Sequence, residues 1–429
     1  MASVDFSSLT GVFKEAYGSK IADNIPDSNI ITRLTQFQKG EKLLGNLYHV
    51  PVKVQANVGA TYNADGSAFT ILPAIPMVTK DAQIRGSEIL IPGPIAYATI
   101  TRSAGKNSFG RAMDIMIDDL RKSIRKRVEL SLLWGGGVVS TAIPAGASLG
   151  LTNATSVTAT SATVTTIVMK LSDWAPGIWS GLTGAQVNFY VVSSGALVSS
   201  AADAIFTITS ITVSTRTIAF TGTSTGATAL VSAAAADLAV YFRGAIGVEM
   251  IGLRGIINNT GTLFNVDGAT YEQWQGNTYA AGSAQLTFEK VQDAVAALAG
   301  RGLEEDVTVF VACTTYAKLN SELAGARVLD SSYDKKTGKN GVEMIEFFGS
   351  NGKIAIVAHP YMKESFAMIL PTDHCYRIGS TEPTFQPVPG ANSVFHQTSN
   401  AGVEVRVYTD QAVFVDAPSW CSLVTGIVN

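Results

Sequence analysis

The sequence predicts an α+β protein that carries an inserted all-β domain. Three patterns lead to this prediction. Strand-prone runs with turn residues fill 55–103, and one long amphipathic helix follows over 108–134. After residue 245, helical and strand patterns are mixed. Between these parts, 160–244 repeats short β-branched and aromatic runs, which favours a β module.

The composition favours an assembly and speaks against a strongly basic nucleic-acid binder. The 429 residues have a formal net charge of −3, and only 15% are charged while 46% are hydrophobic. A surface that neighbouring subunits cover needs fewer charges than the surface of a lone monomer. No stretch is apolar enough to span a membrane, and the N-terminus lacks a secretory pattern. Three widely spaced cysteines suit a reducing compartment, so we expect a soluble intracellular product.

The first part of the chain predicts strands and turns. The stretch "GATYNADGSAFTIL" places Asp65 and Gly66 between two strand-prone runs, a pattern typical of a β-hairpin. Further strands are expected in "QIRGSEILIPGPIAYATITR". Because this part contains few apolar clusters, we expect neighbouring subunits to complete its fold.

The long helix over 108–134 is the most clearly predicted element. Asn107 or Ser108 is suited to cap its start, and three glycines end it. At 1.5 Å per residue its length would be about 40 Å. Its apolar residues recur at steps of three and four, at Phe109, Met113, Met116, Leu120, Ile124, Val128 and Leu132.

A basic segment of this helix, "RKSIRKR" at 121–127, fits three alternatives: a nucleic-acid clamp, a membrane-surface helix or a structural strut. Between 111 and 129 the sequence has six basic and four acidic residues, so the net charge of this part is only +2. A clamp or a membrane helix would present one sign of charge. We therefore interpret the segment as a strut with a salt-bridged face. That face carries Arg121, Lys122, Arg125, Lys126, Asp114, Asp118 and Glu129, with the expected pairs Asp118–Lys122 and Arg125–Glu129.

Arg127 projects toward the apolar side of the helix instead. Its guanidinium either bends back to water or meets a carboxylate of the hairpin or of a neighbouring subunit. We place candidate assembly contacts at Arg127 and, on the solvated face, at Arg121, Lys122, Arg125 and Asp118.

The segment 138–245 is rich in Ala, Ser, Thr and Gly and has only six charged residues. Within it, "AIFTITSITVSTRTIAFTG" predicts a hairpin that turns near 214–216. A low-complexity linker is the alternative, but the recurring aromatic runs favour a β module that folds as a separate unit. After 245, "TFEKVQDAVAALAGRG" predicts a helix, and "VTVFVA", "GKIAIVAHP" and "SFAMILP" predict strands.

The sequence offers little catalytic chemistry. It has no phosphate-binding loop, no dinucleotide fingerprint and no His-rich metal spacing, so we expect no cofactor and no metal. The run Asp373, His374, Cys375 would suit a thiol nucleophile in a cytoplasmic hydrolase. Adjacent residues rarely face one another, and a strand-end loop with a buried thiol is the other interpretation. We therefore expect that this protein is not an enzyme.

In the order of its elements the chain resembles a tailed-bacteriophage major capsid protein of the Hong Kong 97 type. The hairpin region, the long helix ending in "VELSLLWGGG", and the stretches "GLRGIINNTGTLFNVD", "NGKIAIVAHPYMKES" and "YTDQAVFVDAP" carry the resemblance. It implies an N-terminal arm at 1–54, an extended hairpin loop at 55–104, and a spine helix with the start of a peripheral domain at 105–159. The inserted all-β domain would occupy 160–244, a departure from the minimal fold. The axial domain and the rest of the peripheral domain would occupy 245–429.

The function that this resemblance implies is structural. Hexamers and pentamers would form an icosahedral shell around phage double-stranded DNA, held weakly and without sequence preference, in a virion assembled in the host cytoplasm. A scaffolding protein and a portal would be partners, and a membrane would not. The same fold builds encapsulin compartments, which enclose proteins, and such a shell is the alternative function.

Overall fold

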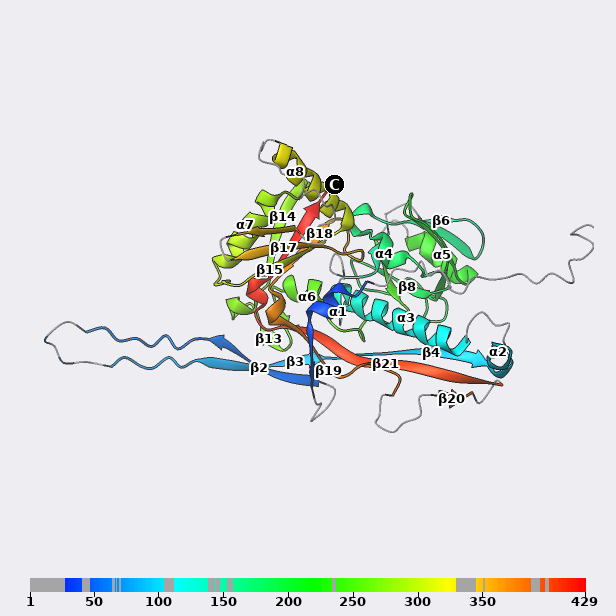
Figure 1. Ribbon diagram of the computed structural model, residues 1–429, viewed down its shortest axis with the longest axis horizontal. Coiled ribbons are helices and arrows are strands. Elements are labelled where there is room, and N and C mark those ends of the chain that lie inside the picture. Colours follow the sequence, from blue (N-terminus) through cyan, green and yellow to red (C-terminus); the bar gives the residue numbers. More distant parts are fainter. Residues whose placement is uncertain are drawn as a thin grey trace, which may run out of the picture.

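The computed structural model shows a body of two sheet-containing lobes above a long basal sheet, with one hairpin projecting to the side (Figure 1). The structure describes residues 28–40, 47–63, 66, 68, 71–103, 112–137, 143, 147–152, 157–233, 237–328, 345–349, 352–386, 394–397 and 401–429. Helices and strands are both abundant, which confirms the predicted α+β class.

The projecting hairpin is formed by β2 (Leu47–Gln55) and β3 (Val78–Arg85), which pair antiparallel. Gly66 lies in a turn with a φ of +83°, a conformation that glycine adopts without strain, whereas Asp65 lies outside the described residues. The strand β2 begins inside the range given above to the N-terminal arm. The chain that leaves β3 returns to the body (Figure 1).

The basal sheet has five strands in the order β1-β19-β21-β20, with β4 also paired to β21. Its strands are β1 (Gln36–Lys39), β4 (Ser87–Ala96), β19 (Cys375–Thr384), β20 (Val394–His396) and β21 (Gly402–Val415). Strand β1 follows the short helix α1 (Ile30–Leu34) and pairs parallel with β19. Helix α2 (Tyr97–Ser103) follows β4. The sheet thus joins parts of the chain that lie far apart in the sequence.

The predicted long helix is confirmed as α3 (Ala112–Trp134), while 107–111 lie outside the described residues. It lies on the basal sheet, against β4 and β21 (Figure 1). Its apolar stripe is buried there through Leu120, Ile124 and Val128. The glycines that follow are needed for close packing, since a Cβ at Gly135 would lie 2.4 Å from the carbonyl oxygen of Met250.

The segment after α3 forms an antiparallel sheet of seven strands in the order β5-β11-β8-β9-β10-β7-β6. The strands are β5 (Gly150–Leu151), β6 (Thr158–Ala159), β7 (Val164–Val168), β8 (Gln186–Val191), β9 (Phe206–Thr212), β10 (Thr217–Thr221) and β11 (Leu238–Phe242). The hairpin predicted near 214–216 is confirmed by β9 and β10, with Arg216 at a φ of +56° in the turn.

This segment is not purely β, contrary to the expected all-β composition. It contains α4 (Pro176–Trp179), α5 (Ser224–Ser232) and the 3₁₀ turn η2 (Leu171–Asp173). The sequence "STGATALVS" of α5 is Ala- and Thr-rich, which concealed its helical character, but Thr223 caps it by accepting a hydrogen bond from the Gly226 N–H.

The remaining lobe is built on a six-stranded mixed sheet in the order β14-β22-β18-β15-β17-β16. Its strands are β14 (Asn277–Ala284), β15 (Val307–Val311), β16 (Ile345–Phe348), β17 (Lys353–Ala358), β18 (Phe366–Leu370) and β22 (Ser422–Ile427). Helices α7 (Phe288–Ala299) and α8 (Cys313–Val328) belong to it, as predicted for α7. Connecting elements are α6 (Leu253–Ile257), β12 (Thr262–Leu263), β13 (Val266–Asp267), η4 (Glu272–Trp274), η6 (Thr372–His374) and η7 (Pro418–Trp420).

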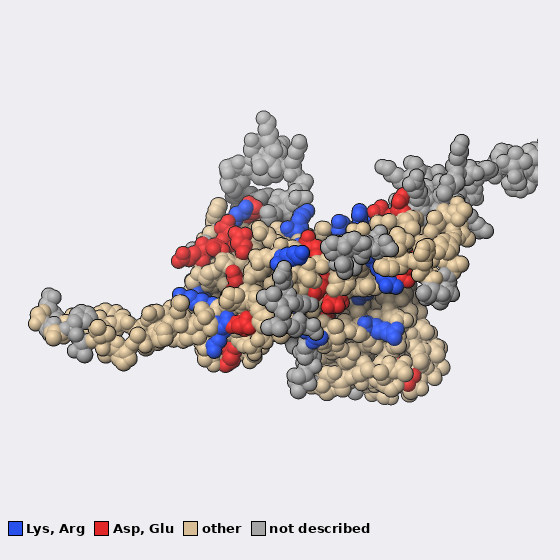
Figure 2. Space-filling view, turned by 90° about the horizontal axis from the view of Figure 1, so that it is seen from below, with Lys and Arg blue, Asp and Glu red and all other residues tan. Residues whose placement is uncertain are grey.

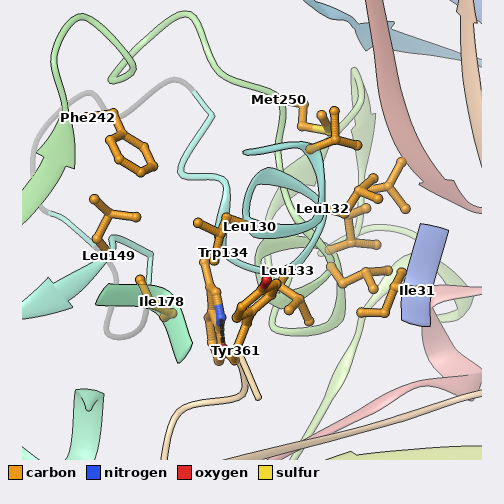
Figure 3. Packing of buried hydrophobic residues seen from close by; sticks show 14 of the residues in the cluster. Ile31, Leu130, Leu132, Leu133, Trp134, Leu149, Ile178, Phe242, Met250 and Tyr361 are labelled. Atoms are coloured by element: carbon orange, nitrogen blue, oxygen red, sulfur yellow. Dashed lines mark hydrogen bonds between the residues drawn. The ribbon is translucent and has the colours of Figure 1, made fainter. Parts of the chain in front are cut away.

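One large apolar core links the basal sheet, α3 and the seven-stranded segment. Figure 3 shows the last turns of α3 inside it, with Ile31 of α1 on one side and Leu149, Ile178 and Phe242 on the other. Apolar residues of this segment therefore also pack against the body, and its independent folding stays a prediction. None of the described helices is long and apolar enough to cross a membrane.

Candidate assembly surface and the polar contacts of the long helix

The middle turns of α3 place in solvent three of the four candidate assembly contacts expected on the solvated face. Asp118, Arg121 and Arg125 are exposed and Lys122 is half-buried. The guanidinium of Arg121 lies 5.8 Å from the ring centroid of Phe385. The pairs Asp118–Lys122 and Arg125–Glu129 that the sequence predicts on this face stay predictions.

Two residues expected on that solvated face are buried instead. Lys126 donates a hydrogen bond to the carbonyl oxygen of Ser180, and its ammonium lies 5.6 Å from the Tyr361 ring centroid. Burial, together with the charge of Arg127, lowers the pKa of Lys126 to about 8. Glu129 is fully buried. The sequence pattern assumes that one side of the helix stays in water, but every residue of α3 from Val128 to Trp134 is buried.

Glu129 holds the N-terminal arm against α3. Its carboxylate accepts hydrogen bonds from the backbone N–H groups of Ile31 at 2.7 Å and Thr32 at 3.0 Å, and from the Thr32 hydroxyl. His359 Nε2 lies 3.0 Å from the same carboxylate. Because His359 Nδ1 accepts the Tyr361 N–H at 3.1 Å, Nε2 carries the proton and donates to Glu129. Four donors from α1 and His359, which lie far from Glu129 in the sequence, thus satisfy this buried carboxylate.

Arg127 lies close to an aromatic ring and a carboxylate of its own chain. Its guanidinium lies 3.1 Å from the ring centroid of Phe242, a cation–π contact. Burial lowers the pKa of Arg127 to about 10, although the nearby carboxylate of Glu249 acts in the opposite direction. Burial also raises the pKa of Glu249, which accepts a hydrogen bond from Ser131. A carboxylate near Arg127 is thus that of Glu249 in the same chain, and a contact of Arg127 with a neighbouring subunit stays a prediction.

Two open hollows of about 460 and 470 Å³ lie on either side of Arg127 and Phe242. Strand β4 lines both of them with Leu90 and Ile91. Apolar side chains stand at their rims, since Leu90 and Val248 are each 51% exposed. Such exposed aliphatic side chains beside a hollow are suited to contact another protein.

Many of the exposed large apolar side chains among the described residues lie between β2 and β3, in a part of the hairpin that we call the distal hairpin. Tyr62 is 94% exposed and Ile71 is 82% exposed; Val58, Leu72, Ile75 and Met77 are exposed as well. Between residues 56 and 79 the chain has one charged residue, Asp65, and that pattern would have identified the feature. In Figure 2 the described part of this hairpin shows no charged side chains beyond its base.

The Asp373–His374–Cys375 run does not form a thiol nucleophile. Both ring nitrogens of His374 contact carboxylates, at 2.9 Å from Glu305 and 2.7 Å from Asp416, so neither serves the thiol. Burial raises the pKa of Cys375 to about 12, which keeps it protonated. The described residues include no group of three or more His, Cys, Asp or Glu side chains that could hold a metal ion.

Solved capsid structures share this fold over their whole length. The capsid asymmetric unit of Cyanophage A-1(L) matches with a TM-score of 0.55 at 10% sequence identity, covering 99% of this chain and 100% of that chain. The capsid of a native GTA particle matches with a TM-score of 0.51 at 8% identity, covering 100% of both chains. No protein-family model matches the sequence, and no curated protein matches it. From end to end, the chain has the fold of these capsid subunits.

Proposed function

We propose that this chain is a major capsid protein of the Hong Kong 97 type. It self-assembles into hexamers and pentamers that form an icosahedral shell around phage double-stranded DNA, and its role is structural rather than enzymatic. A scaffolding protein and a portal are its partners in the host cytoplasm, and the virion is its final location. The whole-length match in fold to two capsid subunits supports this proposal.

Within this proposal, the arm, hairpin loop, spine helix, inserted domain and axial domain keep the ranges given by the sequence. One adjustment follows from the strands, because the hairpin begins at Leu47 rather than at 55. The inserted domain contains helices, and it packs on the body through the shared core.

The observation that carries the proposal is the distal hairpin. It extends away from its own body (Figure 1), and its exposed apolar side chains find no cover there. A soluble monomer rarely presents so much contiguous apolar surface. In a shell, a neighbouring subunit covers it. The exposed Arg121, Arg125 and Asp118, with half-buried Lys122, then form a weakly charged face for subunit or DNA contacts, and Arg127 holds the adjoining surface in shape.

A charge in the hairpin tests the proposal. We expect Ile71→Asp to abolish particle formation, as judged by electron microscopy and sedimentation, because a carboxylate would be buried against the neighbour. The subunit itself should fold normally, since Ile71 is 82% exposed. Val213→Asp is the matched control, at 49% exposure on the turn after β9, and should assemble like the unmodified chain. Normal particles from Ile71→Asp would refute the hairpin contact.

The contents of the particles test the second part of the proposal. Particles recovered from infected cells should contain nuclease-protected double-stranded DNA. A protein cargo in place of DNA would identify an encapsulin-type shell instead. A stable monomer of the unmodified chain at micromolar concentration would refute both kinds of shell.

A further inference from the structure

In its C-terminal part, the chain crosses twice between the six-stranded sheet and the basal sheet. The first crossing leads from β18 through η6 into β19, and the second leads from β21 through η7 into β22. The two run side by side, because β18 pairs with β22 and β19 pairs with β21. A backbone hydrogen bond from the Asp416 N–H to the His374 carbonyl oxygen, at 3.2 Å, ties them together. We call residues 371–375 and 415–421 the joint.

His374 occupies the centre of the joint. Its Nδ1 lies 2.7 Å from an oxygen of Asp416 on the second crossing. Its Nε2 lies 2.9 Å from an oxygen of Glu305, in the loop that leads into β15 of the six-stranded sheet. The Trp420 ring packs edge-on against the imidazole, with centroids 4.8 Å apart. One imidazole therefore joins three separate parts of the chain.

Both contacts need a donor on the histidine, because ionised carboxylates only accept hydrogen bonds. Only the imidazolium has an N–H on each ring nitrogen. A neutral ring would donate to one carboxylate and turn a lone pair toward the other, so the two contacts could not both be hydrogen bonds. The geometry thus depends on a single proton.

We propose that His374, Glu305 and Asp416 form a proton-controlled clasp that fixes the angle between the six-stranded sheet and the basal sheet. The regulatory meaning rests on the proposed shell function, in which this angle sets how neighbouring subunits meet. The clasp is closed when His374 is protonated and opens when the proton leaves. Since each subunit carries one clasp, a shell would repeat the change at every position.

The electrostatics of the joint agree with this geometry. Burial lowers the pKa of His374, but the hydrogen bonds and charges of Glu305 and Asp416 outweigh it, so that the pKa lies above its usual value. Half-exposed carboxylates and a partly exposed ring give solvent access to the proton. The clasp therefore contributes its full stability below about pH 6.5, and loses it as the pH rises through the raised pKa.

The two buried thiols and the phenol of Tyr376 at the joint do not change charge in this range. Burial raises the pKa of Cys375 and of Tyr376 to about 12, and that of Cys421 well above its usual value. The negative charge of Asp416 raises each of these three pKa values further. The positive charge of Arg377 partly lowers the pKa of Cys375. Asp373 adjoins His374 in η6 as a further carboxylate. His374 is thus the group of the joint whose charge changes near neutral pH.

Hydrogen–deuterium exchange read by mass spectrometry tests the clasp, in subunits and in particles alike. Exchange at the imidazole C2 position gives the pKa of His374, which should exceed about 6.5. Backbone exchange of 371–376 and 415–421, corrected for intrinsic rates, should accelerate as the pH rises through that pKa. A pKa raised by one unit corresponds to about a tenfold change in the opening constant.

Three variants make the result decisive. His374→Gln should remove the pH dependence of exchange at the joint, and Glu305→Gln should lower the pKa of His374 while leaving the ring in place. His49→Gln is the matched control, because His49 also contacts a carboxylate, Asp81 at 2.7 Å, but lies in the hairpin. A pKa at or below about 6.5, or an unchanged pH dependence in His374→Gln, would overturn the clasp. Neither readout requires shell formation, so failure of the proposed function would be seen separately, in the assembly of Ile71→Asp.

Discussion

Replacing Glu129 with alanine should release the N-terminal arm from α3. The carboxylate accepts two backbone N–H groups and one hydroxyl from α1, and it receives the Nε2 proton of buried His359. Hydrogen bonds to a charged group contribute about 1.5–3 kcal/mol each, and they are not additive. Alanine would leave these neutral donors without their acceptor, and each buried unsatisfied donor costs about 1–3 kcal/mol. We therefore expect the free energy of opening of the N-terminal arm to fall by about 3 kcal/mol or more.

Backbone hydrogen exchange of residues 28–39 measures this loss. Since 1.4 kcal/mol is a factor of ten, the Ile31 and Thr32 amides should exchange more than about 100-fold faster in Glu129→Ala. Glu129→Gln keeps an acceptor of the same size and should show a smaller change. Asp118→Ala, on an exposed turn of the same helix, is the control and should change exchange little. Exchange within about threefold of the unmodified chain in Glu129→Ala would refute the anchoring role of this carboxylate.

Three further outcomes follow from the buried contacts. Lys363 is fully buried 3.1 Å from Asp173, so Lys363→Met should lower the free energy of unfolding by about 3–5 kcal/mol in denaturant titrations, and Lys363→Met with Asp173→Leu should recover most of it. Arg127→Met should cost about 1–2 kcal/mol in the same titration through the lost cation–π contact, whereas exposed Arg125→Met should stay within about 0.5 kcal/mol; equal losses would contradict the contact. The fragment 160–244, expressed alone, should give poorly dispersed amide resonances, because its apolar core is shared with the body; a well-dispersed spectrum would show that it folds independently.

The sequence predicted those elements whose pattern is local. The period of three and four identified α3, and the strand-prone runs around 214–216 identified the β9–β10 hairpin. The stretch "TFEKVQDAVAALAGRG" identified α7, and in the structure the Thr287 side chain caps it by accepting the Lys290 N–H. Each of these rests on residues within one element. The same reasoning missed α5, whose small residues carry a weak helical pattern.

Polar partners could not be predicted, because they come from distant parts of the chain. The expected partner of Glu129 was Arg125, one turn away, but the carboxylate faces α1 and His359. The sequence suggested a contact of His374 with the thiol of adjacent Cys375, but the imidazole contacts the carboxylates of Glu305 and Asp416. A local pattern states which face a side chain occupies only if one side of the helix remains in water. At the C-terminal end of α3 that condition fails.

The structure shows where the few charged residues of the chain lie. Several of the few charged residues, among them Glu129, Lys126 and Lys363, are buried in contacts that fix the body, and the hairpin from 56 to 79 carries one charge. An exposed apolar hairpin of this kind would promote uncontrolled association of subunits unless the contacts that it makes form a closed ring. If the hairpin of one subunit docks on a different surface of the next, the contact is heterologous, and such contacts close into rings when the rotation between subunits allows it. Rings of five and six differ only modestly in that rotation. In the clasp proposed for His374, a change in the angle between the two sheets of each subunit would therefore alter the rotation that decides how the ring closes.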